Sequence, residues 1–145
     1  MADSGTLSTV ASITSGFGVA MLFFRIQREL QMGERDEIVW IPQADWLLIA
    51  ATLVSLLLVI LPLVSLDLRN TSLINLPAAA CSASSMLLAG YILSILAHYR
   101  LLFGRRRSGP RENPEPAERI LVWITIVLAA VIFIAVFIMS KATAT

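Results

Sequence analysis

The stretch Trp46–Leu66, WLLIAATLVSLLLVILPLVSL, decides the fold because it carries no charged residue. As an α-helix its roughly 21 residues extend about 31 Å, enough to cross the hydrocarbon core of a bilayer. Asp45 directly precedes the stretch and is expected to cap the helix, because its carboxylate can accept from the first backbone N–H groups. Pro62 lacks an N–H, so it is expected to kink or end the last turn. The stretch therefore predicts a transmembrane helix.

Three further apolar stretches accompany this one, at residues 7–24, 73–97 and 120–139. The chain is 57% hydrophobic and 14% charged, with a mean hydropathy of +0.80. Soluble domains carry about 25% charged residues, so the composition, like the long apolar stretches, indicates a membrane protein. The sequence predicts an all-α fold, a polytopic transmembrane four-helix bundle that forms a single domain over residues 1–145. Residues 25–45 and 98–119 are its longer connecting loops.

Small residues dominate the first half of the 73–97 stretch, which reads PAAACSASS from Pro77 to Ser85. Small side chains let membrane helices approach closely, so this stretch is predicted to be the central packing helix. Its hydroxyl groups are expected to bond between helices, and the alternative is that they line a narrow polar path. We expect helix packing at Gly16, Ala79, Ala83 and Gly90, where Gly16 follows Ser12 in a small-xxx-small pair.

The 7–24 stretch is the weakest of the four because it contains several Ser, Thr and Gly residues. A secretory signal peptide is the alternative, but such a peptide needs a positive N-terminal region. No Lys or Arg precedes Arg25, whereas Asp3 lies near the start. We therefore interpret residues 7–24 as a transmembrane span, and whether it crosses completely is left open at this point.

The distribution of basic residues predicts the orientation. The loops 25–45 and 98–119 together hold nine Lys and Arg residues, whereas the connection after residue 66 and the C-terminal tail together hold two. Short loops rich in Lys and Arg stay in the cytoplasm. We expect both termini outside and both long loops in the cytoplasm of a bacterial cell, with the protein in the inner membrane. Trp46, Tyr99 and Trp123 fall at the cytoplasmic ends of their helices, where aromatic residues are enriched.

Groups that carry chemistry are scarce. The chain has one Cys and one His, so neither a disulfide within the chain nor a Cys/His metal cluster is expected. No ionisable residue falls well inside a span, which argues against a proton-coupled transporter. His98 is expected at the interface without a ligand partner, and Cys81 as a small buried side chain rather than an acylated one. We predict no catalytic residue, metal or cofactor, and no enzyme activity.

A compact basic cluster, Arg105, Arg106 and Arg107, lies in the second long loop. Each charge near a membrane surface contributes about 1 kcal/mol of attraction to anionic lipids, so the cluster is a candidate lipid contact. Nucleic acid is not an expected partner, because no stacking aromatic residues accompany the run.

Two functional hypotheses remain from the sequence. The first is a non-catalytic accessory, assembly or structural subunit whose partners are membrane lipids and another membrane protein or a second copy of itself. The alternative is an oligomeric channel or facilitator for a small solute, with hydroxyl groups around a hydrated axis. The residues expected to line that axis are Ser12, Thr14, Ser82 and Ser85.

Overall fold

A computed structural model describes residues 3–33, 43–65, 74–99 and 115–142. Within these ranges every regular element is a helix and no strand occurs. Four helical segments are long and apolar enough to cross a membrane. They are Ser4–Arg28, Asp45–Ser65, Leu76–His98 and Pro116–Met139. The predicted all-α transmembrane fold is confirmed, and each span lies close to its predicted position.

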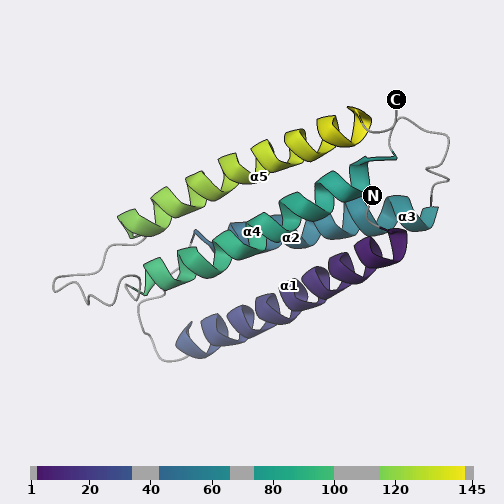
Figure 1. The fold of residues 1–145 in the computed structure, drawn as a ribbon. Helices are drawn as coiled ribbons and strands as arrows, with labels where there is room; N and C mark the ends of the chain where they lie inside the picture. Colours follow the sequence, from purple (N-terminus) through teal and green to yellow (C-terminus); the bar gives the residue numbers. More distant parts are fainter. Residues whose placement is uncertain (1–2, 34–42, 66–73, 100–114, 143–145) are drawn as a thin grey trace.

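The helices run alternately up and down the bundle (Figure 1). The first helix begins and the last helix ends at one end of the bundle. At the opposite end, α1 (Ser4–Gly33) stops, α2 (Asp45–Val54) starts, α4 (Leu76–His98) stops and α5 (Pro116–Ala142) starts. We call this opposite end the junction end. It brings together residues that are far apart in the sequence.

Helix α1 is longer than the predicted span of residues 7–24, since it continues to Gly33. No Gly or Pro interrupts residues 19–32, and the segment after Arg25 is rich in good helix formers. A membrane limits the apolar length of a span but does not end the helix. The additional residues therefore extend α1 beyond the apolar segment.

The second span is continuous but changes its helical type. Helix α2 passes into a π-helical segment, η1 (Ser55–Ile60), and then into α3 (Leu61–Ser65). Pro62 lies just after the π-helical segment and is buried. A proline ring clashes with the carbonyl four residues earlier, here that of Leu58, and a wider turn relieves this clash. The predicted disturbance near Pro62 thus takes the form of a changed helical turn upstream of it.

Helix α4 is the central helix, as its small residues predict. It contacts α1, α2, η1 and α5, and half of its span is buried. Gly90 shows why small residues matter, because a Cβ atom there would overlap the side chain of Thr125 in α5. Gly18 of α1 likewise has no room for a Cβ atom beside Thr52 of α2. These two glycines permit the close approach of neighbouring helices.

Helix α5 lies at the edge of the bundle. It packs chiefly against α4, and only 17% of its apolar span is buried. Large apolar side chains on its outer surface are exposed, including Val127 and Ile134. In a bilayer such a surface faces lipid or another membrane protein.

Candidate functional site at the junction of four helices

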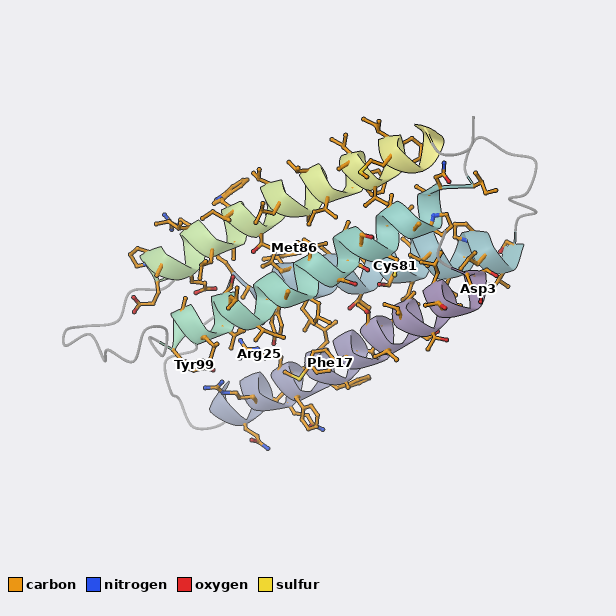
Figure 2. The ribbon with its side chains drawn as sticks, in the orientation of Figure 1. Asp3, Phe17, Arg25, Cys81, Met86 and Tyr99 are labelled. Carbon is orange, nitrogen blue, oxygen red and sulfur yellow. The ribbon has the colours of Figure 1, made fainter. Side chains whose placement is uncertain are left out.

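Charged and aromatic side chains of all four spans gather at the junction end. We call this group, consisting of Arg25, Asp45, His98, Tyr99 and Glu118, the polar junction. Figure 2 shows Arg25 and Tyr99 at this end of the bundle and Asp3 at the other. Asp45 and Glu118 lie in the first turns of α2 and α5, His98 and Tyr99 lie at the end of α4, and Arg25 lies about two turns before the end of α1.

A buried pair joins α4 to α5. His98 Nδ1 and Glu118 Oε2 lie 2.6 Å apart, a short hydrogen-bond distance. The Glu118 side chain is fully buried and that of His98 is 3% exposed. A polar pair that is removed from water must satisfy its remaining hydrogen-bonding capacity within the protein. The second carboxylate oxygen of Glu118 does so.

That second oxygen joins α5 to the start of α2. The backbone N–H of Ala44 donates to Glu118 Oε1 over 2.9 Å. Ala44 is itself fully buried and directly precedes α2. Backbone N–H groups at a helix start have no partner in their own helix, and an acidic group stabilises that end. Glu118 therefore links α2, α4 and α5 with one carboxylate.

A second pair joins α1 to α2. Arg25 donates from Nε and Nη2 to the same oxygen, Asp45 Oδ2, over 3.1 and 3.0 Å. The side chains of this pair are partly buried, at 13% and 21% exposed. The expectation that Asp45 is the N-cap of α2 is wrong, because Ala44 occupies that position and Asp45 is the first helical residue. The Asp45 carboxylate accepts from Arg25 of the preceding span.

Tyr99 completes the polar junction on the side of α1. The guanidinium of Arg28 donates to the Tyr99 hydroxyl and lies 5.5 Å from the centre of its ring. Cation–π geometry of this kind adds attraction to the hydrogen bond. The Tyr99 ring meets His98 edge to face at 5.1 Å. Tyr99 thereby links α1 to the buried pair.

The contacts of His98 add to what the sequence predicted. His98 lies at the end of its span, as expected, and it is buried and paired with Glu118. The sequence contained the signal for this pair. His98 ends one span and Glu118 begins the next, so an antiparallel arrangement places both at the same end.

The residues predicted for helix packing fall on different faces. Ala79, Ala83 and Gly90 are buried on α4. Gly16 lies on the exposed face of α1 and has nothing within 4 Å of a Cβ atom built there. The inward face of α1 carries Gly18 instead, so Gly16 packs against no other helix among the described residues. Arg105, Arg106 and Arg107 lie outside the described residues.

His, Cys, Asp and Glu are the residue types that could hold a metal ion in the described part of the chain. Its His, Cys, Asp and Glu side chains include no group of three or more arranged to hold a metal ion. Cys81 is buried near the start of α4, at the opposite end of the helix from His98 (Figure 2). The polar junction contains acids and bases, but its described contacts are contacts between helices.

Comparison with known proteins finds no matching family model, curated protein or solved structure. The class of protein is therefore defined by the fold alone. Four apolar helices of membrane-spanning length are those of a multi-pass membrane protein.

Proposed function

We propose that this chain is a non-catalytic accessory, assembly or structural subunit that associates with another protein in the bacterial inner membrane. The observation that carries the proposal is how the polar junction uses its charged groups. Arg25 binds Asp45, and Glu118 binds both His98 and the Ala44 N–H. Ionisable groups in membrane proteins are costly and commonly mark functional pathways. Here they connect helices, which favours a scaffold role over chemistry or transport.

The outer surfaces of the bundle support an associating protein. Helices α1 and α5 have the two smallest buried shares among the four spans, at 22% and 17%. Each exposes large apolar residues along its length, for example Ile13 on α1 and Ile134 on α5. Two such surfaces leave room for a partner's transmembrane helices without any change within the bundle.

The proposed orientation keeps residues 25–45 and 98–119, the two loops predicted from the sequence with the helix ends that adjoin them, on the cytoplasmic side. It rests on the nine basic residues in these loops against two elsewhere. Exposed tryptophans support an interface at the junction end, because Trp46 and Trp123 lie near the starts of α2 and α5. Arg105, Arg106 and Arg107 would then face the anionic cytoplasmic leaflet and bind its lipids.

A site-specific photocrosslinking experiment in intact cells tests the accessory role. A photoreactive residue is placed at Ile134 or Ile13, which are 56% and 67% exposed. The same residue at Trp46 serves as a control at the junction end. We expect one partner protein to be captured repeatedly from one helix face. Capture of lipid alone at every position would refute a stable protein partner.

The oligomeric channel remains the alternative function, but the geometry gives it less support. Within one copy, Thr14 faces inward whereas Ser12 and Ser85 are exposed. Ser82 and Ser85 also donate to carbonyls of their own helix. The four hydroxyls therefore do not all lie on the outer surface of one copy, where an axis between copies would be lined. Mass determination in gentle detergent discriminates the two functions, since the channel requires a closed homo-oligomer.

A further inference from the structure

Three buried serine hydroxyls lie in the middle of the bundle, away from the polar junction. They can be located relative to an adjoining apolar cluster in which α1, η1 and α4 contact one another. The members of that cluster are Ala11, Val59, Ala80 and Cys81. Four residues correspond to about one helical turn, so a residue four positions away lies on the same helix face.

Three serines lie one such turn from the cluster. Ser15 follows Ala11 by four positions, Ser84 follows Ala80 by four, and Ser55 precedes Val59 by four. Because α1 and α4 run opposite to η1 (Figure 1), all three steps lead towards the junction end. The three serines are therefore at one level inside the bundle. All are buried, and Ser55 and Ser84 are fully buried.

Two of these hydroxyls have already used their hydrogen atoms. Ser15 donates to Ala11 O over 2.8 Å, and Ser84 donates to Cys81 O over 3.0 Å. A hydroxyl has one hydrogen and two lone pairs. Each of these oxygens therefore offers only acceptor capacity to the bundle interior. Bonds to their own helices also replace the interhelical hydrogen bonds that the sequence predicted.

The third hydroxyl, Ser55 Oγ, is buried and has no hydrogen-bond partner in the described part of the chain. Ser55 is also the first residue of the π-helical segment, and π-turns occur frequently at functional sites. Leaving a buried hydroxyl unpaired is unfavourable. A polar contact that exceeds direct hydrogen-bond reach is commonly bridged by water.

We propose that Ser15, Ser55 and Ser84 bind one ordered water molecule at the centre of the bundle. The water accepts from the Ser55 hydroxyl and donates its two hydrogens to Ser15 Oγ and Ser84 Oγ. This makes three hydrogen bonds, the usual number for a buried water. The guest is neutral because the three serines and the adjoining cluster supply no carboxylate to balance a cation. The site does not depend on the accessory role.

The thermal unfolding midpoint of Ser55→Ala in lipid nanodiscs tests the proposal, because a bound water and an empty site predict changes in opposite directions. If the water is present, removing its donor breaks a satisfied network and lowers the unfolding midpoint. Ser84→Ala is expected to lower the midpoint in the same way. If the site is empty, Ser55→Ala removes an unpaired hydroxyl and introduces a better helix former, so the midpoint rises. A rise would overturn the proposal.

Ser82→Ala is the matched control on the same helix. Ser82 also donates to its own helix, to Ala78 O, but it is only half-buried and faces away from the three serines. The unfolding midpoint of Ser82→Ala should match that of the wild type. If Ser82→Ala lowered the midpoint as much as Ser84→Ala, the destabilisation would follow from losing any serine on α4. That result would overturn the assignment of Ser84 to a water site.

Two further measurements identify the guest. In water-edited solid-state NMR of serine-labelled protein, water magnetisation should reach the Ser55 Cβ, and Ser84→Ala should remove the transfer. Absence of transfer in the wild type would refute the site. The wild-type midpoint should be equal in sodium chloride and choline chloride of the same ionic strength. If sodium raised the unfolding midpoint and Ser55→Ala abolished that rise, the bound species would be a cation and the proposal of a water would be wrong.

Discussion

Glu118 of α5 approaches His98 of α4 to 2.6 Å while its other oxygen receives the N–H of Ala44 at the start of α2. One carboxylate thus holds three helices together at a point where its side chain is fully buried. This arrangement makes Glu118 the residue whose loss should matter most to the packing of the junction end.

Glu118→Ala is expected to destabilise the folded protein by about 3–5 kcal/mol, because it leaves His98 and the Ala44 N–H buried without their partner. Denaturant unfolding in mixed micelles measures the change. Arg119→Ala is the control, since Arg119 is its exposed neighbour in the same turn. Equal stability of the two variants would contradict the junction described here. The double variant with His98→Ala should lose less than the sum of the two single changes.

The Arg25–Asp45 pair is expected to contribute less, about 0.5–1 kcal/mol, because its side chains are partly exposed and solvent screens them. A double-mutant cycle with Arg25→Gln and Asp45→Asn isolates this coupling. The same unfolding measurement at increasing salt should reduce it. A coupling energy larger than that of His98 with Glu118 would reverse the proposed ranking of the two pairs.

Gly90→Ala should destabilise the protein by about 1–3 kcal/mol, since the added methyl group overlaps Thr125. Gly16→Ala is a matched control that makes the same chemical change on an open helix face. It should be neutral or stabilising, because alanine favours a helix by up to about 1 kcal/mol over glycine. Thr125→Ala is expected to restore part of the loss at Gly90. Equal tolerance at both glycines would exclude close α4–α5 packing.

Cysteines introduced at Arg69 and Arg106 should react with an impermeant thiol reagent from opposite sides of the membrane. The expectation follows from the distribution of basic residues, and both positions lie outside the described residues. A Cys81→Ala background removes the native thiol. Labelling of both cysteines from the same side in intact cells would refute the proposed topology.

The sequence by itself determined the number and kind of membrane-spanning helices, because a span needs only about 20 consecutive apolar residues. The stretch from Trp46 to Leu66 meets this requirement without any information on its neighbours in space. Small residues also predicted that α4 is the central helix. The sequence did not predict which face of α1 packs against the other helices. Ser12 and Gly16 form a small-xxx-small pair in the sequence, yet both lie on the exposed face of α1. Rotation of a helix about its axis depends on its neighbours.

Only the tertiary structure decided the pairing of polar groups. Asp45 matches the local pattern of an N-cap, but Ala44 occupies that position and the Asp45 carboxylate accepts from Arg25 of the preceding span. His98 and Glu118 are separated by a loop and meet only because α4 and α5 run antiparallel. Hydropathy is a sum over neighbouring residues and fixes the spans, whereas a hydrogen bond depends on the position of single atoms from distant segments.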